Sequence, residues 1–94
     1  PMMIRVSYSL FDENNDRVQD YFNSDWLEDR DHPFHKIPSV GDIPIVRVIE
    51  MVRVVQGMLL NFPEMKTCQM SLTRPSILKP DEGYYMKLLV QAKL

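Results

Sequence analysis

The sequence predicts a small α+β protein, built as a twisted antiparallel sheet or a partly open β-barrel of four to five strands with one covering helix. Two observations predict this class. Several segments alternate apolar and polar residues, which is the period of a half-buried strand, and turn-forming residues separate them. One segment spaces its aromatic residues as a helix does. The 94 residues are enough for one core, so we expect a single domain over 1–94.

The N-terminal third predicts a strand and then a helix. Residues 3–10 predict a strand, because from Ile4 to Leu10 apolar residues alternate with Arg5, Ser7 and Ser9. The polar segment 12–15 is rich in residues that form turns and cap helices. A helix near 15–28 follows in this interpretation, with Asp16 in its first turn, where the helix dipole favours negative charge. The apolar residues at helical spacing are Val18, Tyr21, Phe22 and Trp26.

Residues 29–42 contain two prolines and Gly41 without sustained periodicity, so we expect an ordered surface connection there.

Residues 43–60 admit two interpretations. A helix is compatible with Asp42 before the segment and with Gly57 as a stop signal. A strand is favoured by composition, because seven of the eleven residues from Ile45 to Val55 are valine or isoleucine. Branched side chains lose rotamer freedom in a helix and pack well on a sheet. We therefore predict a strand and keep the helix as the alternative.

The C-terminal third predicts a β-hairpin. Residues 66–73 alternate cleanly, with Cys68, Met70 and Leu72 on the inward side. A turn over 79–83 ends in Gly83, and residues 84–92 resume an extended pattern. Pro75 lies in the first arm, where the missing amide hydrogen is tolerated at a sheet edge.

Composition narrows the functional classes. The formal net charge of −2 disfavours a general affinity for nucleic acid or anionic lipid, which needs a concentrated positive field. No apolar run approaches the roughly 20 residues of a membrane-spanning helix, and we expect a cytoplasmic protein. The single cysteine, Cys68, has no internal partner for a disulfide and is expected to be a buried thiol.

Charge is distributed unevenly. Residues 1–31 contain eight acidic and three basic residues, whereas the remainder contains eight basic and five acidic residues. The acidic residues are interleaved with aromatic ones, so the predicted acidic helix offers a docking surface for a protein with a basic surface, such as a nucleic-acid-binding protein. The plainer interpretation is the solvated face of an amphipathic helix. The predicted binding residues are Asp16, Asp20, Asp25, Trp26, Glu28, Asp29 and Asp31.

Catalytic, metal and cofactor sites are not predicted. His32 and His35 lie near two carboxylates, but the chain has no third histidine or second cysteine, so we expect a solvated polar loop rather than a metal site. The serines lack a glycine-framed nucleophile turn, and the three glycines are too isolated for a phosphate-binding loop. We predict no catalytic residue and no cofactor.

A nucleic-acid alternative rests on aromatic and basic residues of the predicted strands. They would form a stacking platform for single-stranded nucleic acid on a small barrel. These residues are Tyr8, Tyr84, Tyr85, Arg5, Arg47, Arg53 and Lys87.

The start Pro1-Met2-Met3-Ile4, running into a strand, resembles tautomerases of the macrophage migration inhibitory factor and 4-oxalocrotonate type. The resemblance covers about ten residues and implies Pro1 as a catalytic base. It also implies a long amphipathic helix and a repeated β-α-β unit, neither of which the remaining sequence predicts.

The hypothesis we carry forward is a non-catalytic protein-binding module, a small inhibitor or accessory protein that acts through its acidic surface. A second expectation concerns partners: self-association through a sheet edge, since an exposed edge strand needs a partner or a protective device.

Overall fold

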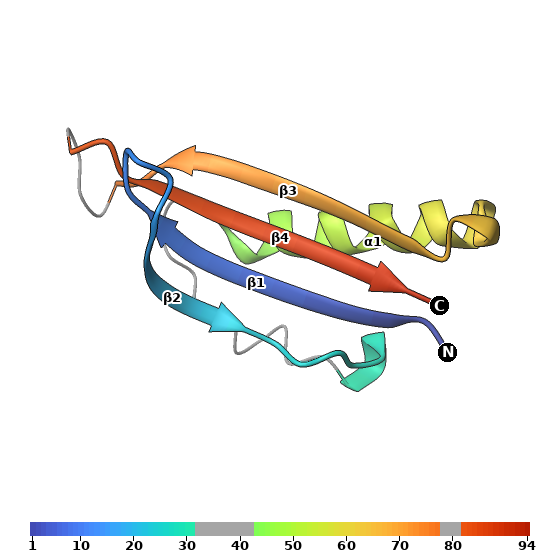
Figure 1. Cartoon of the computed structure of the whole chain (residues 1–94). Helices are drawn as coiled ribbons and strands as arrows, with labels where there is room; N and C mark the ends of the chain where they lie inside the picture. The colour runs from blue at the N-terminus through green and yellow to red at the C-terminus, as the bar shows by residue number, and fades with distance from the viewer. Residues whose placement is uncertain (32–42, 78–81) are drawn as a thin grey trace.

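In the part of the chain that the structure describes, four strands form one antiparallel sheet, and one α-helix packs on one of its faces (Figure 1). The computed structural model describes residues 1–31, 43–77 and 82–94. This arrangement confirms the predicted α+β class, and the sheet is open rather than closed into a barrel. The elements are β1 (Met3–Phe11), β2 (Arg17–Asn23), α1 (Ile45–Asn61), β3 (Thr67–Pro75) and β4 (Tyr85–Lys93), with short 3₁₀ turns at Asp29–Asp31 and Pro63–Met65.

The strand order is β2-β1-β4-β3, so β1 and β4 form the centre of the sheet. These two strands pair over nine positions from Met3↔Lys93 to Phe11↔Tyr85 without interruption. β3 pairs with β4 over the same length. The pairing of β1 with β2 is different, since its register shifts twice.

The core lies between the central strands and α1. Alternate residues of a strand point to opposite faces, so β1 and β4 each turn four apolar side chains toward the helix. Burying each large aliphatic side chain contributes about 1.5–3 kcal/mol relative to exposure. The buried residues are Ile4, Val6, Tyr8 and Leu10 on β1, Met86, Leu88, Val90 and Ala92 on β4, and Val48, Met51, Val52, Val55 and Leu59 on α1.

The predicted helix near 15–28 is wrong, because β2 occupies most of that segment. The pairing passes from Tyr8↔Phe22 to Ser9↔Asp20, which leaves Tyr21 as an extra residue. Such a bulge breaks the two-residue alternation, and the adjacent aromatic residues then imitate helical spacing. The ring of Tyr21 packs edge-on against that of Tyr8, with centroids 6.4 Å apart.

The polar segment 12–15, which was predicted to precede a helix, forms the turn between β1 and β2. The carboxylate of Asp12 accepts hydrogen bonds from the backbone amides of Asn14 and Asp16, at 2.9 and 3.0 Å. Asn15 adopts a left-handed conformation with φ 64°, which asparagine tolerates better than most residues. Turn residues and helix-capping residues are the same chemical types, and here they close a hairpin.

The predicted strand over 43–60 is also wrong, since Ile45–Asn61 forms α1. Its buried residues, including Val48, Val52 and Val55, recur at helical spacing and pack on the sheet. The intrinsic cost of a valine in a helix is at most about 0.7 kcal/mol, which is less than the gain from burying its side chain. Gly57 lies inside the helix and does not stop it.

The hairpin of the C-terminal third is confirmed. Gly83 has φ 73°, as the predicted turn requires, and Pro75 is the last residue of an edge strand. Most of the expected connection at 29–42, with His32 and His35, lies outside the described residues. No helix among the described residues is long and apolar enough to cross a membrane.

Candidate binding face

The face of the sheet opposite α1 carries a different set of side chains, and we call it the open face. Register places alternate residues of all four strands on it. No helix covers it in the described parts of the chain. Its residues are Arg5, Ser7, Ser9 and Phe11 on β1, Tyr85, Lys87, Leu89, Gln91 and Lys93 on β4, Arg17, Asp20 and Asn23 on β2, and Thr67, Gln69, Ser71 and Thr73 on β3.

The centre of the open face is hollowed. A shallow pocket of about 300 Å³ extends across the strands from Arg17 to Ser71. Short serine side chains and Leu89 line its middle, while Arg5 and Lys87 approach from the sides. The small residues leave space above the sheet, and longer basic residues border that space.

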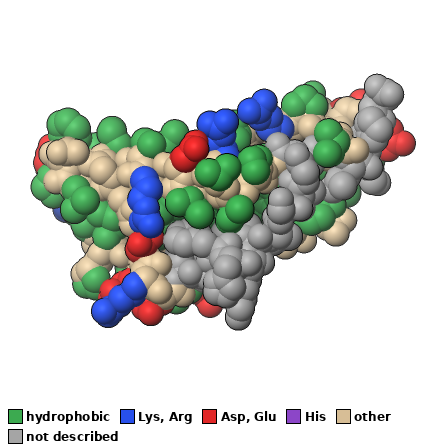
Figure 2. Space-filling model, turned by 180° about the vertical axis from the view of Figure 1, so that it is seen from behind, with side chains coloured by type: hydrophobic (Ala, Val, Ile, Leu, Met, Phe, Trp, Pro, Cys, Tyr) green, Lys and Arg blue, Asp and Glu red, His purple; other side chains and the backbone are tan. Residues whose placement is uncertain are grey.

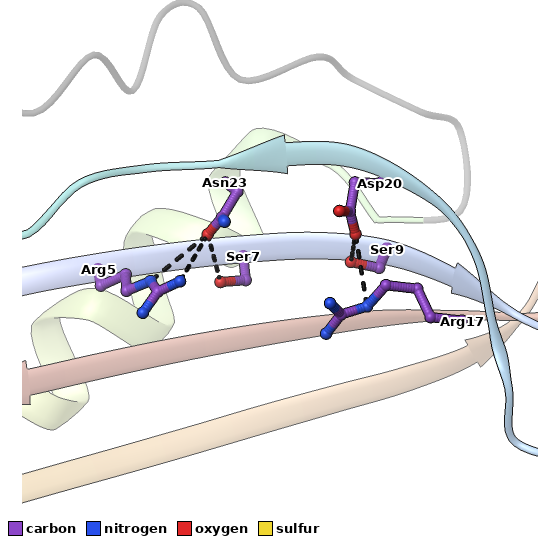
Figure 3. Close-up of polar contacts among 6 residues, drawn as sticks. All are labelled: Arg5, Ser7, Ser9, Arg17, Asp20 and Asn23. Atoms are coloured by element: carbon purple, nitrogen blue, oxygen red, sulfur yellow. Dashed lines mark hydrogen bonds and ion pairs between the residues drawn. The ribbon is translucent and has the colours of Figure 1, made fainter.

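Arg5 is held in place by Asn23 of the neighbouring strand (Figure 3). The side-chain oxygen of Asn23 accepts hydrogen bonds from Nη2 and Nε of Arg5, at 3.2 and 3.4 Å, and from the hydroxyl of Ser7 at 3.1 Å. Asn23 is neutral, so this contact orients the guanidinium without cancelling its charge.

Arg17 is positioned by Asp20 at the other end of β2 (Figure 3). The carboxylate of Asp20 lies 3.4 Å from Nε of Arg17 and accepts a hydrogen bond from the buried hydroxyl of Ser9 at 2.9 Å. The register irregularity beside Ser9 aims Asp20 at this hydroxyl. Among the described residues, Arg17 is therefore the one cation of the open face whose charge a carboxylate offsets.

Phe11 marks one end of the open face and has cations close to its ring. The Lys87 ammonium lies 4.3 Å from the ring centroid, and the Arg17 guanidinium lies 5.7 Å from it. Both distances are within the range of cation–π attraction. Lys87 also donates a hydrogen bond to the side-chain oxygen of Asn15.

Trp26 marks the opposite end. Its ring lies 4.2 Å from the ammonium of Lys93. Together with Thr67 and Gln69 these residues line a second depression, of about 340 Å³. The open face therefore has an aromatic ring and a basic group at each end, with a hollow lined by serines and Leu89 between them.

The charge of the open face opposes that of the whole chain. Four basic residues lie on it (Arg5, Arg17, Lys87 and Lys93) and one acidic residue, Asp20, whereas the chain has a net charge of −2. Within the described residues Arg5, Lys87 and Lys93 form no ion pair with a carboxylate. The three cations concentrate positive potential on the sheet face opposite α1.

The structure disperses the acidic residues that were predicted to share one helix face. Asp16 lies in the β1–β2 turn, Asp20 on the open face, and Asp25 in an exposed position after β2. Asp29 forms a 2.8 Å ion pair with Arg53 of α1. The role of these acidic residues in docking a basic partner stays a prediction, although the helix on which it was based is not formed. Glu28 and Asp31 lie 3.2 and 3.9 Å from Arg30, and Trp26 contacts Lys93.

The predicted stacking platform is only partly assembled. Arg5, Lys87 and the partly exposed Tyr85 share the open face, but Tyr8 is buried in the core. Arg47 and Arg53 lie on α1, on the other side of the sheet. Sequence reasoning missed Phe11, Arg17 and Lys93. The signal for Phe11 was its place in the same alternation as Arg5, Ser7 and Ser9.

The fold differs from the one that the tautomerase resemblance implies. Pro1 is exposed, and the strands that flank α1 lie at opposite, antiparallel edges of the sheet. The β-α-β repeat that the tautomerase resemblance implies is therefore absent from the described ranges. Residues 1–31, 43–77 and 82–94 bring no three potential metal ligands together, and the two histidines are outside these ranges.

Comparison with protein-family models, curated proteins and solved structures finds no match to this chain.

Proposed function

We propose that this chain is a binding module whose open face takes a single strand of nucleic acid. The observation that carries the proposal is the set of three cations, Arg5, Lys87 and Lys93, that have no carboxylate partner in the described structure and lie beside aromatic rings on the uncovered face.

Electrostatics favour an anionic ligand at this place. The net charge of the chain is negative, but a ligand on the open face experiences mainly the electrostatic potential of the nearby basic side chains. Phosphate groups bound by Arg5, Lys87 and Lys93 would release condensed counterions, and this release is the main source of non-specific affinity for nucleic acid.

The aromatic residues favour unpaired bases over a duplex. Phe11, Tyr85 and Trp26 offer ring faces or edges at the two ends of the open face. Stacking of a base on such a ring is worth about 1–3 kcal/mol, and it needs a base that is not already stacked inside a double helix. Lys87, which lies over Phe11 in the free protein, would move from the ring to a phosphate.

The length of the open face suits a short segment of single-stranded nucleic acid. Arg5 and Phe11 lie six residues apart on β1, which corresponds to about 20 Å. Serine, threonine, glutamine and asparagine side chains lie between these two positions and provide hydrogen-bond donors and acceptors for base edges.

The test is a fluorescence-anisotropy titration, in which a short labelled single-stranded oligonucleotide is titrated with the wild-type protein and with each of two triple variants. One variant, Arg5→Gln with Lys87→Gln and Lys93→Gln, removes the unpaired cations. The control, Arg30→Gln with Arg47→Gln and Arg53→Gln, removes the same charge from residues that already form ion pairs. We expect at least a tenfold loss of affinity in the first variant and less than a threefold loss in the control, as orders of magnitude for phosphate contacts.

Equal losses in the two variants would show that only total charge matters and would reject the open face as the site. Tighter binding of the corresponding duplex than of the single strand would reject the stacking argument. No binding by the folded wild type at low salt would reject the function itself.

A further inference from the structure

The outer edge of β3 is unusually regular. β3 pairs with β4 through nine consecutive positions without a bulge, and within the described residues no strand covers its other edge. Arg74 is its single charged residue, and its proline is the last residue. Natural edge strands are commonly protected by charges, bulges or short length. β2, the opposite edge, has seven residues, two register irregularities and the charged Arg17 and Asp20.

A groove of about 250 Å³ lies between this edge and α1. Its lining is apolar, from Met51 and Val54 of the helix to Met70 and Leu72 of β3, and Arg47 and Glu50 lie at its side, 3.3 Å apart. Val54 is 49% exposed, and Met58, one turn further along the same stripe of the helix, is 40% exposed. Figure 2 views this side of the molecule and shows hydrophobic side chains along the helix, interrupted by basic and acidic ones.

We infer that β3 and this groove form the interface of a symmetric homodimer, in which two copies pair edge to edge and antiparallel. This inference does not depend on the proposed function. A two-fold axis at Ser71, the middle residue of β3, lets all nine residues of each strand pair. Met70 of one copy then faces Leu72 of the other, and Cys68 faces Arg74. No two like charges are opposed anywhere along the paired strands.

The groove is self-complementary under the same axis, which an interface between identical surfaces requires. It lies beside Met70, Ser71 and Leu72, at the centre of the paired edges, so the two grooves meet. Each groove carries one positive and one negative group, and the two-fold axis sets Arg47 and Glu50 of one copy against the same pair in reversed order. A second copy therefore covers both the apolar lining and the free strand edge.

The dimer also has a geometric consequence for the open face. Ser71 lines the central pocket on that face, and the two-fold axis passes between the two copies of Ser71. The two open faces would join across the axis into one surface of eight strands, with the cations of both copies on the same side.

The first test measures mass in solution by light scattering and sedimentation over a range of concentrations. Wild type is expected at twice the chain mass, with dissociation on dilution. Val54→Asp, in the groove, is expected to give monomers. Its matched control, Val46→Asp, changes a valine of the same helix that is slightly more exposed, at 57%, and does not line the groove, and this variant is expected to leave the dimer intact. Circular dichroism confirms that each variant is folded.

The second test fixes the register. With Cys68 replaced by serine, Ser71→Cys is expected to form a disulfide between copies under mild oxidation, because the axis places residue 71 opposite itself. Thr67→Cys, at the end of the same strand, faces Pro75 and is expected to stay unlinked. A monomeric wild type, a Val54→Asp variant as dimeric as wild type, or equal cross-linking at positions 67 and 71 would each overturn the inference.

Discussion

The same two central strands contribute to both faces of the sheet, but the side chains on the two faces differ in polarity and in burial. Toward the helix, β1 and β4 place eight apolar residues that are almost completely buried. Toward the open side, the intervening residues are serines, glutamine, Leu89 and the unpaired cations. Residues that are neighbours in sequence therefore have different roles: one set forms the core and stabilises the fold, and the other set forms the exposed surface. Substitutions at adjacent positions of one strand should therefore differ strongly in their effect on the free energy of unfolding.

The largest expected difference is between Leu88 and Leu89. Leu88 is fully buried, whereas Leu89 lines the pocket of the open face. We expect Leu88→Ala to lower the free energy of unfolding by about 2–5 kcal/mol, through lost burial and a cavity. Leu89→Ala is expected to cost less than about 1.5 kcal/mol, because water already reaches that side chain. Urea denaturation of both variants measures the difference, and equal costs would contradict the assignment of the two faces.

A smaller effect is expected at Ser24, where a buried hydroxyl closes the edge of the core. The backbone amide of Val6 donates a 2.8 Å hydrogen bond to the Ser24 hydroxyl, and the amide of Ser24 donates one to the carbonyl of Val6. Ser24→Ala leaves the amide of Val6 without this acceptor, and we expect a loss of about 1–3 kcal/mol in the free energy of unfolding.

Ser7→Ala is the matched control, since the Ser7 hydroxyl bonds to Asn23 on the open face. Its expected cost is below about 1 kcal/mol, because water replaces the lost contact. Thermal and urea unfolding of the two serine variants side by side provides the check. A cost at Ser7 as large as that at Ser24 would mean that the open face is closed to water.

The smallest effect is expected at the ion pair between Asp29 and Arg53. Both side chains are substantially exposed, at 38% and 54%, so solvent screens their attraction. Asp29→Asn is expected to change the free energy of unfolding by less than about 1 kcal/mol, and less in high salt than in low salt. Urea denaturation at two salt concentrations measures this; a loss above about 2 kcal/mol would indicate a structural role for the pair.

The strands with strict alternation could be predicted from sequence, because one buried face imposes a two-residue period on β1, β3 and β4. β2 could not, because the extra residue Tyr21 shifts that period. α1 was mistaken for a strand because its valines and isoleucines favour a sheet locally, whereas packing on β4 decides the outcome.

The candidate site was harder to predict than the fold. The acidic residues are concentrated in sequence but dispersed in space, and the cations of the open face are dispersed in sequence but gathered in space. Arg5 and Lys93 lie at opposite ends of the chain, and only the antiparallel pairing of β1 with β4 brings them to the same face. Net charge conceals this arrangement, because it carries no information about position.

The measurement that tests the central claim most directly is the salt dependence of wild-type binding to single-stranded nucleic acid. Three phosphate contacts on the open face predict that the logarithm of the association constant falls with the logarithm of salt concentration with a slope of about −2. The variant that lacks Arg5, Lys87 and Lys93 is expected to show a slope near zero. A wild-type slope near zero, or the same steep slope in that variant, would contradict the assignment of the open face as a nucleic-acid site.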